Sequence, residues 1–255
     1  MIGLSVCLIT LNEERNLPRS LRSVQGIADE IVVVDCGSED RTQEIAGEFG
    51  AKLLVHPWSD FANQKNFAAD SASHPWIVSL DADEELSPEL RRSLLNWKHQ
   101  EPQFEVYELA RRAFYLGGWI THAGWYPDRQ RRLYRRDAAR FSGIIHESLR
   151  FSGKPGRLQG DLFHYTMSSF AEHEEKVERY STLAAQQMYA AGVRKWRSGM
   201  WLAAPWSWFR SYVVRGGFLN GHRGVLIARM AGRAVYLKFN KLGQMVTQSE
   251  RGNPR

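Results

Sequence analysis

The chain has 255 residues, 43% hydrophobic and 24% charged, with a formal net charge of +6, as expected for a globular protein with a sizeable core. The N-terminal residues lack the basic and apolar regions of a signal peptide, and no run of about 18 apolar residues predicts a transmembrane helix. The two cysteines, Cys7 and Cys36, lie in or beside predicted core strands, which favours a reduced cytosolic setting over a disulfide framework.

Short apolar runs alternate with helical patterns in the first third of the chain. The pattern predicts strands at 4–10, 31–35, 53–56 and 76–80, with a helix after each of the first three strands. This β-α-β-α-β-α-β order is typical of a doubly wound α/β sheet with helices on both faces. Ligands of such sheets bind at the carboxyl ends of the strands.

Polar residues stand at three of these strand ends. Thr10 and Asn12 follow the first strand, Asp35 ends the second, and Asp81-Ala-Asp83 follows the fourth. Four carboxylates within residues 81–85 repel one another unless a cation lies among them. The spacing therefore predicts a divalent cation, Mg²⁺ or Mn²⁺, completed by a diphosphate. The alternative is a solvated turn that leads into the next helix.

Two common nucleotide sites are disfavoured. The first strand is followed by neither G-x-G-x-x-G nor G-x-x-x-x-G-K-[ST], so a dinucleotide-binding Rossmann site and an NTPase phosphate loop are not expected.

Ordered motifs carry a family resemblance. TLNEE at 10–14, IVVVDCGSEDRT at 31–42 and LDADE at 80–84 resemble the family 2 glycosyltransferases of GT-A fold. GWYPDRQRRLYR at 124–135 and GIIHE at 143–147 resemble the bacterial enzymes that add a β-linked glucose to the heptose of the lipopolysaccharide inner core.

The resemblance implies a set of site residues. Asp35 would accept a hydrogen bond from the nucleotide base, and Asp81 and Asp83 would hold the metal under the diphosphate. Lys65 would balance phosphate charge, unless it lies on a solvated helix face. Cys36 stands where the family often has a second acid. The residues implied for the nucleotide pocket are Thr10, Asn12, Glu13 and Asp35.

The middle of the chain is expected to bind the acceptor. Aromatic side chains at Trp119, Trp125 and Tyr126 would suit a sugar, although ordinary packing explains them equally well. The basic run at 129–136 predicts a strand that exposes cations to acceptor phosphates or to the donor diphosphate.

An inverting transfer needs a base for the acceptor hydroxyl, and a carboxylate is sufficient. Asp128, in the aromatic loop, is the preferred base, and Glu147 is the second candidate. The neighbouring His146 is either a third metal ligand or a structural histidine.

The C-terminal part differs from the rest. Ser169 and Glu172 predict a capping box and a helix that runs to about residue 191. The stretch from 179 to 249 holds eleven Lys and Arg and no acid, so the rest of the chain carries about −5 by subtraction. Trp residues beside Arg and Lys favour a membrane interface over nucleic acid as the acidic partner.

Together these patterns predict a GT-A α/β catalytic domain at 1–165, with a nucleotide half at 1–85 and an acceptor half at 86–165. A basic, aromatic helical region at 166–255 follows. The expected activity is inverting transfer of a hexose, with glucose favoured, from a nucleoside diphosphate sugar such as a UDP-sugar to the lipopolysaccharide core. The expected location is the cytoplasmic face of the inner membrane, on anionic lipid and without nucleic acid.

Several alternatives remain open at the level of sequence. A polyprenyl-phosphate or other glycan glycosyltransferase shares the front half of the pattern. A nucleotidyltransferase would normally carry a Gly-rich basic loop after the first strand. A non-catalytic membrane-binding or nucleic-acid-binding module would not need the intact Asp81 and Asp83.

Overall fold

The computed structural model describes residues 1–143, 147–167 and 169–252. The chain forms two compact units. Unit 1 comprises Met1–Arg112 and Asp128–Tyr165, and unit 2 comprises Ala113–Pro127 and Thr166–Arg255. The sequence placed residues 113–127 in the catalytic domain, whereas in the structure they pack with the C-terminal helices. The physical reason is a small apolar cluster that joins Tyr115, Ile120 and Ala123 to Ile227.

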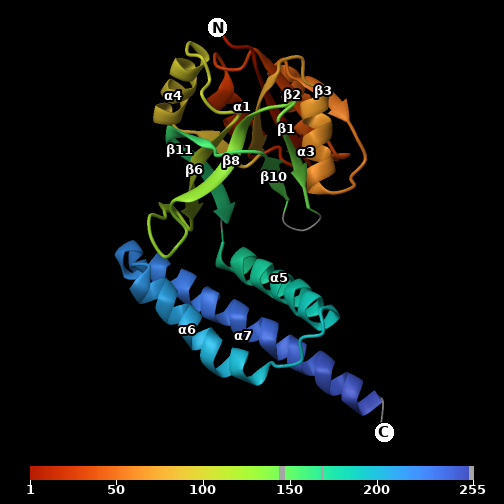
Figure 1. Ribbon diagram of the computed structural model, residues 1–255, viewed down its shortest axis with the longest axis vertical. Helices are drawn as coiled ribbons and strands as arrows, with labels where there is room; N and C mark the ends of the chain where they lie inside the picture. The colour runs from red at the N-terminus through yellow and green to blue at the C-terminus, as the bar shows by residue number, and fades with distance from the viewer. Residues whose placement is uncertain (144–146, 168, 253–255) are drawn as a thin grey trace. The chain divides into compact units, whose positions relative to one another are not determined.

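A mixed β-sheet forms the centre of unit 1 (Figure 1). Its strands follow the order β3-β2-β1-β4-β8-β6-β11-β5. The pairs β2–β3, β1–β2 and β1–β4 are parallel, and β8 runs antiparallel to both β4 and β6. The strand bounds are β1 Leu4–Thr10, β2 Glu30–Asp35, β3 Lys52–Val55, β4 Trp76–Asp81, β5 Glu84–Leu86, β6 Val106–Tyr115, β8 Asp128–Arg135 and β11 Gly156–Met167.

Helices cover both faces of this sheet. Successive residues of a strand point to opposite faces, so in β4 Val78 and Leu80 belong to one apolar cluster and Ile77 to another. The first cluster is closed by helices α1 (Leu17–Val24), α2 (Thr42–Glu48) and α4 (Pro88–Lys98), and the second by α3 (Phe61–Asp70) with the β9–β10 hairpin (Ala139–Ser142 and Ser148–Phe151). The predicted α/β class with helices on both faces is confirmed.

Unit 2 is mainly helical. Helix α5 (Phe170–Ala190) begins after Ser169, whose Oγ accepts a hydrogen bond from the backbone N–H of Glu172 (3.1 Å), as the capping pattern predicted. A second helical stretch follows, and the long helix α7 packs against it and against α5 (Figure 1). The remaining bounds are β7 Gly118–Trp119, η1 Gly199–Ala203, α6 Ala204–Phe209, η2 Arg210–Val214, η3 Gly217–Asn220 and α7 Gly221–Gly252.

Glycine allows the helices of unit 2 to approach closely. A Cβ on Gly199 would meet the ring of Phe239, and a Cβ on Gly243 would meet the ring of Trp196. The rings of Phe239 and Trp196 therefore lie directly on the backbone of η1 and α7. In the part of the chain that the structure describes, no helix is both long enough and apolar enough to cross a membrane.

Candidate active site

The carboxyl ends of β1, β2 and β4 meet at one edge of the sheet. In the strand register, Thr10 lies opposite Asp35 and Ile9 lies opposite Asp81. The polar residues that the sequence placed at separate strand ends therefore do lie at one edge, where α/β proteins bind their ligands.

Asp35 is fully buried and is held by several donors. Its carboxylate accepts hydrogen bonds from Thr10 Oγ1 (2.9 Å), Gln43 Nε2 (2.7 Å) and both the backbone N–H (2.8 Å) and hydroxyl (2.5 Å) of Ser38. Burial alone would raise the pKa of Asp35, but the hydrogen bonds from Ser38, Gln43 and Thr10 outweigh it and lower the pKa overall. Asp35 is therefore a fixed anion that shapes the loop after β2.

Asn12 and Glu13 tie the loop after β1 to the loop after β2. Asn12 has a positive φ of 56°; its backbone N–H donates to Ser38 Oγ (2.8 Å), and its Oδ1 accepts from the N–H of Glu39 (2.9 Å). The backbone N–H of Glu13 donates to Thr42 Oγ1 (2.8 Å). Burial raises the pKa of the Glu13 carboxyl. The two loops thus form one hydrogen-bonded wall at the sheet edge.

Asp81 lies between two cations. Lys65 Nζ is 3.0 Å from Asp81 Oδ1, and Arg132 Nη2 is 2.5 Å from Asp81 Oδ2. Burial would raise the pKa of Asp81, but Arg132 and Lys65 together hold it well below its usual range. Lys65 is itself buried and also contacts Glu147 Oε1 at 3.0 Å, so the alternative of a solvated helix face is wrong.

A chain of alternating charges continues from Asp81 to Asp128. Arg132 Nη2 lies 2.7 Å from Glu84 Oε1, and that fully buried carboxylate is 3.4 Å from Arg111 Nη1. Arg111 in turn donates to Asp128 Oδ2 through Nε (2.8 Å) and Nη2 (2.6 Å). The chain therefore links the D-x-D motif to the preferred base.

Arg111 and Arg132 were not singled out from the sequence. The basic run was expected to expose its side chains, but Arg132 is buried and turned toward the acids. Arg132 and Tyr134 are both buried and share one face of β8, because alternate residues of a strand point to the same side. This two-residue spacing is the signal by which the sequence could have placed Arg132 inward.

Asp83 has a partner that the sequence did not reveal. His164 Nε2 lies 3.2 Å from Asp83 Oδ2, because β11 pairs antiparallel with β5 and sets His164 opposite Glu84. An imidazole and a carboxylate this close can share one cation, and magnesium often takes only one or two carboxylates plus substrate phosphates. His146, the other histidine considered as a ligand, lies outside the described residues.

The described residues contain no group of three His, Cys, Asp or Glu side chains placed to hold a metal. Of the two predicted ligands, Asp81 is paired with Lys65 and Arg132, and Asp83 lies beside the imidazole of His164.

Comparison with known proteins places this site in a family. The family model for glycosyl transferase family 2 matches residues 5–150, more than half of the chain. The chain belongs to glycosyl transferase family 2. A lipopolysaccharide core biosynthesis glycosyltransferase, LpsC of Rhizobium meliloti, is 30% identical to it over 250 residues, which are 92% of each protein. An uncharacterised glycosyltransferase of Rickettsia typhi is 29% identical over 98% of this chain and 89% of the relative.

Among solved structures, this family 2 glycosyltransferase is similar to TarS of Staphylococcus aureus, with a TM-score of 0.46 and 14% identity over 99% of this chain and 92% of the other. The predicted family, its GT-A fold class and its enzyme class are confirmed by the family match and by the mixed sheet.

The glycosyltransferase also contains the aromatic side chains that were considered as sugar platforms. Trp125 belongs to unit 2, where its ring packs 5.4 Å from that of Tyr115 and 5.9 Å from that of His173. Trp119 packs against Phe114 at 4.9 Å. Ordinary packing accounts for the position of both indole rings.

The edge of unit 1 combines the groups that glycosyl transfer needs. Carboxylates and the buried cations Lys65 and Arg132 are paired at this edge, and fixed charges of this kind can stabilise charge that develops in a reaction.

Proposed function

We propose that this family 2 glycosyltransferase moves a hexose, with glucose favoured, from a nucleoside diphosphate sugar to a heptose of the lipopolysaccharide core, with inversion at the anomeric carbon. The observation that supports it most is the charge chain from Asp81 to Asp128, which joins a diphosphate edge to a carboxylate base within one unit. The LpsC relative supports the lipopolysaccharide core as acceptor.

Asp128 acts as the base in this proposal. Its carboxylate takes the proton of the acceptor hydroxyl while that oxygen forms a bond to the anomeric carbon. The bond from the anomeric carbon to the diphosphate oxygen breaks on the opposite face, and its electron pair leaves with the diphosphate. Arg111 and Gln130 Nε2, which donates to Asp128 Oδ1 (2.8 Å), hold the carboxylate in one orientation.

The leaving diphosphate is stabilised at the other end of the charge chain. A divalent cation held by Asp83 and His164 would supply Lewis-acid stabilisation of the departing charge when bound. Lys65, paired with both Asp81 and Glu147, places a buried positive charge at the same edge. Thr10, Asn12, Glu13 and Asp35 form the wall against which the nucleoside, with UDP as the favoured nucleotide, is expected to bind.

The site of action follows from the acceptor and the basic region. We place the enzyme on the cytoplasmic face of the inner membrane, held peripherally by anionic lipid through the basic, aromatic part of unit 2.

The proposed function is tested by transfer to a purified heptose-terminated core acceptor. UDP-glucose should give a β-linked product in the presence of Mg²⁺ or Mn²⁺, and Asp83→Ala or chelation should abolish it while the melting temperature stays unchanged. Transfer within a few-fold of the parent rate after either treatment would reject the metal. Transfer only to a polyprenyl phosphate would reject the acceptor.

A further inference from the structure

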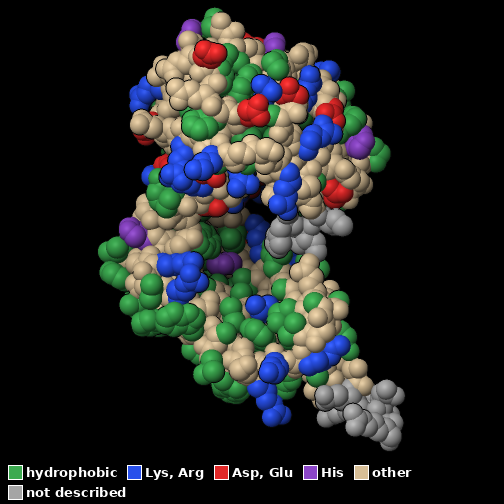
Figure 2. Space-filling view, viewed as in Figure 1, with side chains coloured by type: hydrophobic (Ala, Val, Ile, Leu, Met, Phe, Trp, Pro, Cys, Tyr) green, Lys and Arg blue, Asp and Glu red, His purple; other side chains and the backbone are tan. Residues whose placement is uncertain are grey.

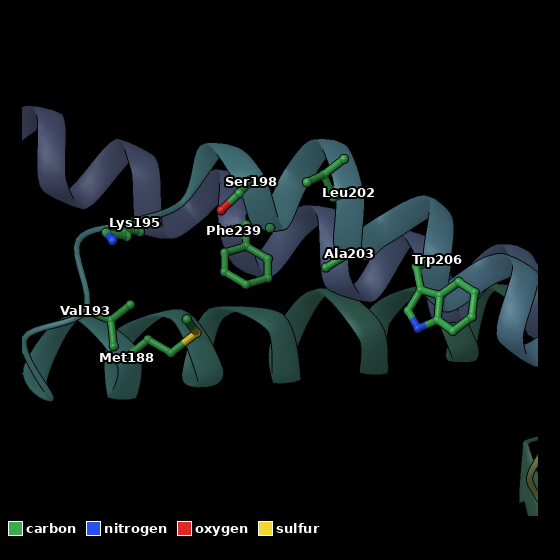
Figure 3. Close-up of a pocket in the computed structure, with 9 residues that line it drawn as sticks. Met188, Val193, Lys195, Ser198, Leu202, Ala203, Trp206 and Phe239 are labelled. Carbon is green, nitrogen blue, oxygen red and sulfur yellow. The ribbon is translucent and has the colours of Figure 1, made fainter.

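An apolar groove of about 690 Å³ runs through unit 2, between the C-terminal end of α5, the helical stretch η1–α6 and helix α7 (Figure 3). Met188 of α5 and Phe239 of α7 point toward each other across it, and Trp206 reaches down toward α5. The groove is lined by Met188, Val193, Lys195, Ser198, Gly199, Leu202, Ala203, Trp206 and Phe239.

The lining of the groove is mostly apolar and carries one cation. Apolar side chains form most of its surface, and Lys195, an exposed residue between α5 and η1, supplies the single charged group of the lining. An elongated hydrocarbon with an anionic head matches such a surface, because the chain removes apolar area from water while the head meets the ammonium.

The charge around the groove points to the same ligand. Arg194 and Arg197 flank Lys195 in the sequence, and both are exposed. No acid occurs between Arg179 and Ser249, and the α5 acids Glu174 and Glu178 pair with Arg233 and Lys241 of α7. The basic residues beside the groove therefore add to its attraction for anions.

The groove is also continuous with an exposed apolar face. Leu202 and Trp206 line the groove, yet they are 71% and 56% exposed, and Trp201 on the same turn is 70% exposed. Hydrophobic side chains gather over α6 and its neighbours, with Lys and Arg among them (Figure 2). Trp and Arg side by side on an apolar face are typical of a segment in the headgroup layer of a membrane.

We propose that the groove binds one acyl chain of an anionic membrane phospholipid, with Lys195 against the lipid phosphate and Met188, Ala203 and Phe239 along the hydrocarbon. This lipid site deepens the proposed function, on which its membrane setting rests. In addition to the non-specific attraction of unit 2 to an anionic surface, the groove would bind one lipid molecule per protein chain.

The test uses the full-length protein and dihexanoyl phosphatidylglycerol below its critical micelle concentration, so that no membrane surface is present. Calorimetry should show one lipid bound per chain. Ala203→Trp fills the groove and should abolish this binding, and Lys195→Glu should weaken it by about five-fold or more, since one basic residue near lipid contributes about 1 kcal/mol. Lys195→Arg should restore it.

Arg229→Glu is the matched control, because Arg229 is an exposed cation of α7 outside the groove lining. It changes the net charge equally. Because Arg229 lies outside the lining, binding of the monomeric lipid should change by less than about two-fold, below the roughly five-fold effect of a cation that contacts the lipid. Circular dichroism establishes whether each variant folds. If Ala203→Trp does not fold, Lys195→Glu still tests the proposal, because Lys195 is exposed and its substitution should not disturb the fold.

Equal weakening by Lys195→Glu and Arg229→Glu, no binding of the monomeric lipid, or tight binding of duplex RNA in its place would each overturn the proposal. Sugar transfer to a soluble heptose acceptor is measured on the same variants. If the parent protein does not transfer sugar to this acceptor, the proposed function is rejected. If the parent transfers sugar but binds no monomeric lipid, only the lipid site is rejected.

Discussion

Asp128 is the first residue of β8 rather than part of the expected loop, and its position depends on neighbouring side chains of β6 and β8. Arg111 Nη2 lies 2.6 Å from one carboxylate oxygen, and Gln130 donates to the other at 2.8 Å. Arg111 is shared with the fully buried Glu84, which Arg132 also contacts. Glu84 and Arg132 are buried, so removing either would leave the charge of the other uncompensated, whereas Arg111 and Asp128 are partly exposed. The buried pair thereby fixes Arg111, which holds the proposed base.

Asp128→Asn should lower the turnover rate by roughly 10²–10⁴-fold, the usual contribution of a general base. Donor binding should barely change, because the amide keeps the size of the side chain and Asp128 does not belong to the nucleotide wall. Steady-state kinetics with separate titration of donor and acceptor measures both quantities.

Glu147→Gln is the matched comparison. Glu147 contacts Lys65, which also holds Asp81, so its loss should act on donor binding more than on turnover. If Glu147→Gln stops turnover while Asp128→Asn does not, the roles of the two carboxylates are reversed.

Among the site residues, the sequence predicted those that belong to short local motifs. It missed the residues whose position depends on pairing between strands far apart in the chain. Asp81 and Asp83 follow an apolar run and could be found from that pattern alone. His164 reaches Asp83 only because β11 pairs with β5, some eighty residues earlier in the chain. Arg111 meets Asp128 through the pairing of β6 with β8. No local periodicity encodes such a register.

The same distinction holds for whole elements. Continuous apolar runs predicted β1, β2 and β4, because parallel strands buried on both faces need apolar side chains at successive positions. The segment at 113–127 groups with the C-terminal residues in the structure, and its sequence did not indicate this because its apolar residues do not show which partner they pack against. That partner is α7, through Ile227.

Helix α5 is joined to β6 within unit 2 by a buried histidine. The ring Nδ1 of His173 lies 2.8 Å from the hydroxyl of Tyr115, and the rings of Trp125 and Phe170 pack around it. Burial lowers the pKa of His173, the nearby Lys176 lowers it further, and Glu174 opposes both. The neutral imidazole is therefore the form that the fold prefers.

This preference predicts a pH dependence of stability. The pKa of His173 is lower in the folded state than the ordinary value of about 6.5, so its contribution is complete above that value. As the pH falls below about 6.5, the unfolded chain takes up a proton first and stability is lost until the folded pKa is passed. Unfolding of unit 2 should therefore require less denaturant at about pH 5.5 than at about pH 7.5.

His173→Gln should reduce this decline, because the amide does not titrate and can still meet the Tyr115 hydroxyl. Intrinsic fluorescence of the full-length protein follows the transition. An equal decline in parent and variant would assign the pH dependence to other groups.

At the scale of the whole molecule, charge and exposed apolar surface coincide in unit 2. Eleven Lys and Arg lie between 179 and 249 without an acid in that stretch, and those other than Arg233 and Lys241, which pair with acids of α5, supply attraction to an anionic surface. The exposed Trp201, Leu202 and Trp206 supply apolar area that favours the headgroup layer. Attraction between exposed charges is screened by salt, whereas burial of apolar area is not. The two contributions can therefore be separated by experiment.

We expect the full-length protein to cosediment with anionic vesicles, to bind neutral vesicles weakly, and to be released only in part at high salt. A protein cut near residue 192 is unsuited to this test, because residues 113–127 pack on α7 and would lose their partner. The double substitution Trp201→Ser and Leu202→Ser keeps every charge and removes exposed apolar area. The variant should therefore still bind anionic vesicles at low salt, mainly through electrostatic attraction. At high salt that variant should be released completely. Equal binding of the parent to neutral and anionic vesicles would remove the electrostatic contribution, and salt-resistant binding by the double variant would show that the apolar contribution lies elsewhere in the chain.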